Sequence, residues 1–425
     1  MQIRAIRGTK DILPGESMQW SAAENLARDL FAKYGYEEIR TPVIEDTALF
    51  KRSIGDTTDI VQKQMYTFQD RGERSITLRP EGTAPVVRAY LENNINNKQG
   101  LVKLFYMGPM FRAERPQAGR QRQFHQIGVE AIGSASPYLD AEVIALLVNF
   151  LKAAGVKDFE VKINNLGCDK DKKIFCDQLK EGLKPNLERL CEDCQSRFGK
   201  NVLRILDCKN HDCKKLIPVI TSYQCDDCES HYHKVLDMLN LLGVKYKTYA
   251  HLVRGLDYYT GTVFEVTAAG LGSQDAIAAG GRYGNLIKDL GGPDVPAIGF
   301  AIGIERLLMA SSPESIVHSP ETKIYIATLG EAARKKAFEL ASELREAGIV
   351  CIMEYDEKSL KAQLKAASNQ ECKYAVILGD DELKKDKIIL RDMSKSEQEE
   401  ISLKSFVTHL KSISYKAVPG TDIKL

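Results

Sequence analysis

The stretch LFYMGPMFRAERPQAGRQRQFHQIGVE, residues 104–130, consists of two strand-like runs on either side of an arginine-rich loop. Because side chains alternate along a strand, one face of each run can be read from the sequence. The outgoing face carries Leu104, Tyr106, Met110 and Arg112, and the return face carries Phe124, Gln126 and Glu130. The pattern predicts a β-hairpin with guanidinium groups at its tip and a polar pair along its floor.

The tip of this hairpin concentrates positive charge around one carboxylate. Four arginines, Arg112, Arg115, Arg120 and Arg122, flank Glu114. Arginine forks suit phosphate oxygens, whereas a carboxylate and an amide on a strand suit a ligand with an amine or a ring N–H. The hairpin therefore predicts a site for a polyphosphate beside a small polar molecule. The alternative is a solvated basic hairpin, which the density of arginine next to inward polar residues disfavours.

Length and composition limit the class of protein. The 425 residues predict two or three domains. With a net charge of +1, a nucleic-acid partner would have to be held by local basic patches. No long apolar run and no apolar signal segment are present, which predicts a cytoplasmic protein without a membrane span. In that compartment the ten cysteines would be thiols or metal ligands, not disulfides.

Periodicity predicts an α+β organisation with a change of character in the middle of the chain. We expect helices over 17–34 and 139–154, and two strands, VQKQMYTFQD and SITLRP, between 60 and 80. Residues 168–240 are interpreted as an inserted helical subdomain. Glycine turns are expected at Gly280–Gly281 and Gly291–Gly292, and a helix from about Gly299 to Ala310. Two domains are expected, 1–320 and 323–425, with a Ser/Pro-rich linker over 311–322 and an α/β pattern after it.

Three further groups of residues suggest chemistry, each with a structural alternative. Residues 79–83, RPEGT, place Glu81 and Thr83 at a helix start, where both could simply cap the helix. Residues 252–267 crowd an arginine and two tyrosines around a glycine turn, which suits a small ligand or a tyrosine-rich core corner. Residues 299–308 place Arg306 among apolar neighbours, whereas a lone helical arginine usually lies on the solvated surface.

Together these segments resemble the histidyl-tRNA synthetases, a family of class II aminoacyl-tRNA synthetases. YEEIRTP (36–42) resembles the family's motif 1, FRAERPQAGRQRQFHQ (111–126) motif 2, and GFAIGIERL (299–307) motif 3. LVRGLDYYTGTVFEV (252–266) and AGGRYGNL (279–286) resemble two histidine-specific signatures. The resemblance extends over essentially the whole chain.

The resemblance implies a fold, a reaction and a set of partners. The fold would be a class II catalytic domain on an antiparallel sheet of six or seven strands, with a helical insertion and a C-terminal α/β domain that binds the anticodon. The reaction would be activation of L-histidine by ATP, with Mg²⁺, followed by transfer to the 3′ end of tRNA(His). The motif 1 helix and Pro42 would form a homodimer interface.

The resemblance also implies roles for individual residues. Arg112 and Arg254 would be catalytic, at the α-phosphate and the reacting carboxylate. The residues implied for ATP are Arg112, Glu114, Arg120, Arg254 and Arg306. Glu130 and Tyr259 would meet the two imidazole nitrogens, while Glu81, Thr83 and Gln126 would contact the α-amino group. The full set implied for histidine is Glu81, Thr83, Gln126, Glu130, Tyr258, Tyr259 and Tyr283.

Six cysteines in the predicted insertion have spacings typical of zinc sites. They are Cys191, Cys194, Cys208, Cys213, Cys225 and Cys228. Structural zinc would hold a small subdomain together. The alternative is that reduced thiols pack as small hydrophobic groups. Family members differ in this insertion, so the resemblance does not assign ligands.

Two other functions fit parts of the sequence. A non-catalytic paralogue, such as the regulatory subunit of ATP phosphoribosyltransferase, would share the catalytic fold without an anticodon domain. A plain RNA-binding protein would have no reason to keep a paired imidazole site. The basic residues of the C-terminal region fit RNA or an ordinary charged surface; they are Lys358, Lys361, Lys365, Lys384, Lys385, Lys387 and Arg391.

Overall fold

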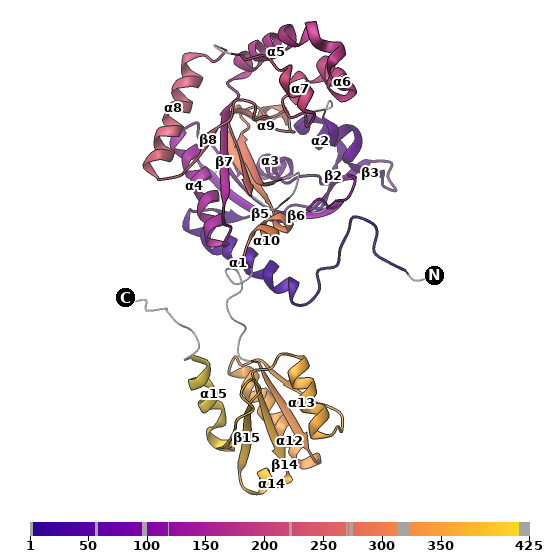
Figure 1. The fold of residues 1–425 in the computed structure, drawn as a ribbon, viewed down its shortest axis with the longest axis vertical. Coiled ribbons are helices and arrows are strands. Elements are labelled where there is room, and N and C mark those ends of the chain that lie inside the picture. The colour runs from indigo at the N-terminus through magenta and orange to yellow at the C-terminus, as the bar shows by residue number, and fades with distance from the viewer. Residues whose placement is uncertain are drawn as a thin grey trace. The chain divides into compact units, whose positions relative to one another are not determined.

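The computed structural model describes residues 3–55, 58–95, 100–117, 119–220, 223–268, 271, 275–312 and 323–415. The chain divides into two compact units, Met1–Val317 and His318–Leu425 (Figure 1). Most of the predicted linker, from residue 313 to 322, lies outside the described residues. In the described part, no helix is long and apolar enough to cross a membrane.

The first unit is built on an eight-stranded sheet in the order β1-β5-β6-β11-β10-β9-β7-β8. Six central strands pair antiparallel throughout: β5 (Val102–Phe111), β6 (Gln123–Ile132), β11 (Ala297–Gly303), β10 (Ala276–Arg282), β9 (Thr260–Ala268) and β7 (Phe159–Asn165). The two-residue edge strands β1 (Glu37–Glu38) and β8 (Lys247–Thr248) pair parallel. The predicted antiparallel catalytic fold is confirmed, although the sheet has eight strands and not the six or seven expected, because the two short edge strands extend it. Of the YEEIRTP segment, only two residues form a strand.

The predicted hairpin is formed by β5 and β6. Its register explains why one face of the sheet is apolar and the other polar. Leu104 lies opposite Glu130, and Met110 lies opposite Phe124, so the two predicted faces coincide. The alternate residues of β6, Ile127, Val129 and Ala131, are fully buried in the main core. One face of the sheet is therefore apolar, while the other carries Gln126 and Glu130.

Helices α1 (Glu16–Lys33) and α4 (Pro137–Ala153) cover the apolar face. In α1 the buried residues Trp20, Ala23, Ala27 and Phe31 recur at helical spacing. The Phe31 ring packs edge-on or tilted against the rings of Phe105, Phe150 and Phe300, at centroid distances of 5.6, 5.5 and 6.2 Å. These contacts fix the sheet against its two long helices.

Shorter elements surround the other face. They are α2 (Thr47–Ile54), a π-helical turn at Ile60–Gln64, α3 (Thr83–Glu92), α9 (Leu286–Asp289) and a small sheet of β2 (Ile44–Asp46), β4 (Ser75–Leu78) and β3 (Tyr66–Gln69). Helix α10 (Ile304–Ala310) packs against α1 instead, and its Ile304 and Leu307 belong to the main core. Helix α3 contributes Val86, Val87 and Tyr90 to a second core beneath the β5–β6 hairpin.

The structure corrects three local predictions. Residues 60–64 form the π-helical turn and not a strand. Gly280 and Gly281 lie inside β10 and not in a turn, because β10 passes so close to its neighbours that a Cβ at either position would collide with backbone oxygen. Residues 299–303 belong to β11, and the helix begins only at Ile304. The small residues of these two strands hide their strand character.

The predicted insertion is helical. It comprises α5 (Asp169–Leu183), a 3₁₀ turn (Lys184–Arg189), α6 (Glu192–Lys200), a second 3₁₀ turn (Val202–Ile205), α7 (His211–Lys215) and α8 (Asp226–Leu241). In Figure 1, α5, α6 and α7 lie at the end of the unit away from α1 and α10. A small core of its own includes Leu179, Leu183, Ile205 and three cysteines.

The second unit is a five-stranded mixed sheet in the order β13-β12-β14-β15-β16. The strands are β12 (Ile324–Leu329), β13 (Cys351–Met353), β14 (Tyr374–Gly379), β15 (Lys387–Asp392) and β16 (Gln398–Ser402). The helices are α12 (Glu331–Glu346), α13 (Leu360–Asn369), α14 (Asp380–Lys384) and α15 (Phe406–Tyr415). The first three strands pair parallel, as an alternating strand–helix pattern requires. This unit has its own hydrophobic core.

Candidate active site

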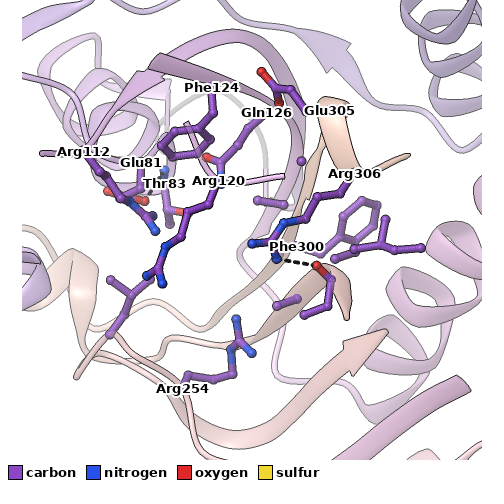
Figure 2. Close-up of a pocket in the computed structure, with 18 of the residues that line it drawn as sticks. Glu81, Thr83, Arg112, Arg120, Phe124, Gln126, Arg254, Phe300, Glu305 and Arg306 are labelled. Carbon is purple, nitrogen blue, oxygen red and sulfur yellow. Dashed lines mark hydrogen bonds between the residues drawn. The ribbon is translucent and has the colours of Figure 1, made fainter. Parts of the chain in front are cut away.

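A cavity of about 250 Å³ opens on the polar face of the large sheet, and all twelve residues predicted for the site line it. Figure 2 labels some of them: Glu81, Thr83, Arg112, Arg120, Gln126, Arg254 and Arg306. The twelve come from the β5–β6 hairpin, the start of α3, the loop before β9, the end of β10 and helix α10. These residues are Glu81, Thr83, Arg112, Glu114, Arg120, Gln126, Glu130, Arg254, Tyr258, Tyr259, Tyr283 and Arg306. Segments more than 200 residues apart in the sequence thus meet in one space.

Glu130 is the buried end of this cavity. Its side chain is 1% exposed, and each carboxylate oxygen accepts one hydroxyl bond. Thr83 Oγ1 donates to Oε1 at 2.7 Å, and Tyr283 OH donates to Oε2 at 2.6 Å. Gly299, directly opposite on β11, leaves the room that the carboxylate needs, because a Cβ there would collide with it.

Burial raises the pKa of Glu130 to about 8, even though the two hydroxyl bonds act in the opposite direction. The nearby Glu81 raises that pKa further. The donors to Glu130 are neutral, so its negative charge is only partly compensated. A ligand that brings an N–H donor to this end would stabilise the ionised carboxylate.

Glu81 both caps a helix and lines the cavity. Its oxygens accept the backbone N–H groups of Thr83 and Ala84, at 2.7 and 2.9 Å, at the start of α3. Burial raises the pKa of Glu81, while the two backbone bonds lower it. The capping alternative is therefore present in the structure, and the carboxylate still lies at the cavity wall beside Thr83.

Aromatic rings form one side of the cavity. The rings of Tyr258 and Tyr259 lie 4.8 Å apart, and Tyr258 meets Tyr283 edge-on at 5.9 Å. All three side chains are buried. They give a small planar ligand an apolar surface with hydroxyl groups at its edge.

Four guanidinium groups reach toward the same open space from separate segments (Figure 2). Arg112 Nε donates to Pro80 O at 2.9 Å, and its guanidinium lies 5.1 Å from the centre of the Phe124 ring. Arg306 donates to the backbone oxygens of Gly119 and Ala276, at 2.9 and 2.7 Å. These bonds hold both side chains in fixed positions.

The other two arginines are paired with carboxylates. Arg254 Nη1 donates to Glu265 Oε2 on β9 at 2.6 Å, and Arg120 forms an ion pair with the buried Glu114. The remaining hairpin arginines, Arg115 and Arg122, do not line the cavity.

The arginines act on one another electrostatically. Burial lowers the pKa of Arg112, and the positive charges of Arg254 and Arg306 act in the same direction, against Glu81. Burial likewise lowers the pKa of Arg120, with contributions from Arg112 and Arg306. Cations that repel one another across a cavity favour an anion between them. This end of the cavity therefore suits a polyphosphate.

Glu305 lines the cavity and was missed by the sequence reasoning. Its two oxygens accept the backbone N–H of His125 at 2.9 and 3.1 Å, and Oε1 also lies 3.1 Å from His125 Nδ1. The residue was hidden because its partner is 180 positions away. Its place beside Arg306, in a segment with few polar residues, was the available signal.

Two family models match most of the chain, and several named relatives match nearly all of it. A family model described as histidyl-tRNA synthetase matches residues 8–171 and 214–307, and one described as anticodon binding domain matches residues 323–413. Proteins named histidine–tRNA ligase from Halothermothrix orenii and Moorella thermoacetica are 50% and 48% identical to it. The matches cover 97% and 96% of this chain and 100% and 97% of those proteins.

Solved structures give the same picture. The apo histidyl-tRNA synthetase of S. aureus has a TM-score of 0.81 at 38% identity, covering 96% of this chain and 100% of that one. A protein described as an ATP phosphoribosyltransferase regulatory subunit/histidyl-tRNA synthetase, from Bacillus halodurans, has a TM-score of 0.66 at 23% identity. That match covers 89% of this chain and 99% of the other, and it concerns the fold alone.

Proposed function

The chain belongs to the histidyl-tRNA synthetase family, the histidine–tRNA ligases, and we propose that its cavity activates L-histidine with ATP. The products would be histidyl-adenylate and pyrophosphate, and the histidyl group would then pass to the 3′ end of tRNA(His). The observation that carries this proposal is a single cavity with a hydroxyl-bonded carboxylate at one end and four guanidinium groups toward the other.

The buried end is proposed to bind histidine. Glu130 and Tyr259 would each meet one imidazole nitrogen, which gives both nitrogens a partner. Glu81, Thr83 and Gln126 would contact the α-amino group, and the amide oxygen of Gln126 is buried without a hydrogen-bond partner among the described residues. A pocket built on such bonds rejects analogues that lack them, by about 10⁴–10⁵ in favourable cases.

The arginine end is proposed to bind ATP. Arg112 would grip the α-phosphate, Arg306 would lie along the phosphates, and Arg120 with Glu114 would hold adenine or phosphate. The strand rise of about 3.3 Å per residue separates Glu130 from the hairpin tip by roughly the length of an amino acid joined to a nucleotide. The two substrates would therefore meet between these ends.

Arg254 is proposed to lie where the histidine carboxylate attacks the α-phosphorus. As that oxygen bonds to phosphorus, the bond to the bridging oxygen breaks and pyrophosphate leaves. Negative charge spreads over the phosphoryl oxygens in this step, so a fixed guanidinium lowers the barrier without moving a proton. The ion pair with Glu265 holds Arg254 in place.

Mg²⁺ is proposed to accompany ATP. This ion prefers oxygen ligands, and it commonly binds one or two carboxylates together with substrate phosphates. Glu305 fits that requirement, since it lines the cavity next to Arg306 and its oxygens are held by a backbone N–H. When bound, the ion would neutralise phosphate charge.

The second unit is proposed to contact the tRNA. Its basic residues lie on or directly beside α13, α14 and β15, and three of them already have carboxylate partners. Lys358 pairs with Glu354, Lys384 with Asp381 and Lys387 with Glu400, at 2.9, 3.7 and 2.7 Å. The Lys384 and Lys387 pairs are exposed and contribute little stability, so phosphate groups could replace those two carboxylates, whereas Glu354 is buried.

A homodimer is proposed on the basis of motif 1 and of an apolar face on the small sheet. The register of β2, β4 and β3 puts five apolar residues on one face: Ile44, Tyr66, Phe68, Ile76 and Leu78. Ile44 and Phe68 remain 52% and 47% exposed, as expected of a surface that a second copy covers. Light scattering that shows only monomer would contradict this assembly.

The cytoplasm is the proposed location, because charged tRNA is consumed there.

Pyrophosphate release tests the proposed reaction. Mixed with ATP and histidine but no tRNA, the protein should form about one equivalent of adenylate and release a matching amount of pyrophosphate. Addition of tRNA(His) should then move the histidine to the tRNA. A protein that binds both substrates but releases no pyrophosphate would have the fold without the reaction, as a regulatory paralogue would.

A further inference from the structure

The insertion gathers metal-ligating side chains into two separate clusters. In cluster A the ligand atoms of Cys191, Cys194, Cys208 and Cys213 all lie within 4.8 Å of one another. In cluster B the same holds for Cys168, Asp171, Cys225 and Cys228. No histidine belongs to either cluster, and two of these eight residues, Cys168 and Asp171, were not among the candidate ligands read from the spacing alone.

The sulfur geometry of cluster A suits a tetrahedral ion. Cys191 Sγ and Cys208 Sγ are 3.8 Å apart. Tetrahedral zinc with Zn–S bonds of about 2.3 Å separates its sulfurs by about 3.8 Å, whereas a disulfide would bring them to about 2.05 Å. All ten cysteines are free thiols.

Backbone groups in cluster A point at the sulfurs. The N–H of Cys191 donates to Cys213 Sγ at 3.2 Å, and the N–H of Asn210 donates to Cys208 Sγ at 3.4 Å. Such N–H donors stabilise negative charge on sulfur and orient the ligand around a metal ion. Thiols packed only as small hydrophobic groups would not need them.

The elements that carry cluster A are short. Cys191 and Cys194 begin α6, which has nine residues, and Cys213 lies in α7, which has five. Isolated helices of this length are unstable in water. A four-thiolate ion would join them to the turn that precedes Cys208 and so replace the large core that the insertion lacks.

Cluster B lies at the base of the insertion, between the turn that follows β7 and the start of α8. Cys168 precedes α5, Cys225 precedes α8, and Cys228 lies in the first turn of α8. Asp171 is only 2% exposed, and its carboxylate accepts the N–H groups of Cys168 and Cys225 at 3.3 and 3.2 Å. Three thiolates and one carboxylate are an accepted zinc ligand set.

We propose that the insertion binds two structural zinc ions, one held by four cysteine thiolates in cluster A and one by three thiolates and Asp171 in cluster B. Cluster A lies wholly in the segment 172–213 that the histidyl-tRNA synthetase family model does not match.

Cluster A also borders a second cavity, of about 520 Å³, that reaches the proposed ATP site. Its wall includes Cys191 and Cys208 on one side and Arg112, Glu114 and Arg120 on the other. The cluster A ion would therefore fix one wall of the space in front of the active site, whereas the cluster B ion would fix the base of the insertion.

Metal analysis of the full-length protein, purified with reductant and without chelator, tests the proposal. We expect two zinc ions per chain and no iron. X-ray absorption should show Zn–S distances of about 2.3 Å. Summed over the two separate ions, the ligands should be seven sulfur atoms and one oxygen atom. Zinc-free protein would overturn both sites, and iron in place of zinc would overturn the identity of the metal.

Two substitutions separate the sites. Cys191→Ser should remove one zinc ion by weakening cluster A, and Cys225→Ser should remove the other by weakening cluster B. Cys176→Ser is the matched control, because Cys176 lies in α5 of the same insertion but in neither cluster, and it should keep both ions. If a variant does not fold, the ratio of sulfur to oxygen ligands around zinc in the unmodified protein still tests whether both sites are occupied. One zinc ion per chain that Cys225→Ser does not affect would overturn cluster B.

Discussion

At the scale of single residues, Glu130 is the residue that we propose determines what the cavity binds. A buried carboxylate is costly unless donors surround it, and here the donors are two neutral hydroxyls, from Thr83 and Tyr283. The raised pKa of Glu130, about 8, records this incomplete compensation. A ring N–H from the substrate would complete it, which links selectivity for an imidazole to the protonation of one side chain.

The pH dependence of histidine use should follow Glu130. Because its pKa lies near 8 in the empty site, the carboxyl is mostly protonated below pH 8 and ionised above it. The ionised form accepts the imidazole N–H more strongly, so kcat/KM for histidine should rise between about pH 7 and pH 9 and then level off.

Glu130→Gln keeps the shape of the side chain and removes its titration. It should lower kcat/KM for histidine by about 10- to 100-fold, the effect of one charge-assisted hydrogen bond, and abolish the rise. Steady-state kinetics of both proteins over this pH range checks the prediction. An equal rise in the variant would assign the titration to another group.

Arg254 should act on the reaction more than on binding. Arg254→Ala should reduce ATP–pyrophosphate exchange by about 10²–10³, the cost of one donor to a developing charge, while the Kd for ATP changes less than tenfold. Arg115→Ala is the matched control, since Arg115 is an exposed arginine of the hairpin loop outside the cavity. Equal losses in exchange and in ATP affinity would remove Arg254 from the transition state.

The residues that line the cavity were largely predictable, but mainly from the resemblance to the histidyl-tRNA synthetases. Strand alternation by itself predicted only the face that β5 and β6 share. The individual roles of the cavity residues remain predictions. Glu305 could not be found in this way, because its bond to His125 depends on how α10 packs against β6.

At the scale of elements, close strand contacts shape the site. Gly299 on β11 lies opposite Glu130 on β6 and leaves space for its carboxylate. The same property obscured the strands in the sequence, because AIAAGGR and AIGFAIG consist mostly of alanine and glycine, which do not mark strands, and have only Ile277 in the first and Ile298, Phe300 and Ile302 in the second. Periodicity identified long helices such as α1 and α4. It could not identify β10 and β11, whose small residues are set by the close approach of neighbouring strands.

Gly299→Ala should destabilise the sheet. Its Cβ would collide with the Glu130 carboxylate and with the backbone oxygen of Val129, so the free energy of unfolding should fall by about 1–3 kcal/mol. In Gly284→Ala the new Cβ would meet only Thr260 Oγ1, at 3.5 Å, an ordinary contact. Denaturant unfolding of both variants checks this. Equal stability would show that β11 can move away from β6 without cost.

At the scale of the whole molecule, the cavity belongs to one of the two units. Every residue that lines the cavity comes from Met1–Val317, and the second unit has a separate core. The α/β alternation of residues 323–415 predicted that unit from the sequence. The division of the insertion's cysteines into clusters A and B could not be predicted. Cysteine pairs with similar spacing occur in both clusters, and only the three-dimensional structure shows which pairs lie together.

A chain that ends at residue 317 should therefore keep one activity and lose the other. We expect ATP–pyrophosphate exchange within a fewfold of the full-length protein, because no cavity residue is removed. Charging of tRNA(His) should fall by at least about tenfold, the loss of one or two good contacts. Parallel assays of exchange and charging measure both. Full charging by the shortened chain would exclude a role for the second unit in tRNA binding.

The central claim is that one cavity activates histidine and no other amino acid. ATP–pyrophosphate exchange, measured with each of the twenty amino acids in turn, tests it most directly. We predict exchange with histidine and at least about 10⁴-fold less with every other amino acid, including glutamine and asparagine, which offer amide groups but no ring N–H. Comparable exchange with a second amino acid, or none with histidine, would contradict the assignment of Glu130 and its neighbours as an imidazole site.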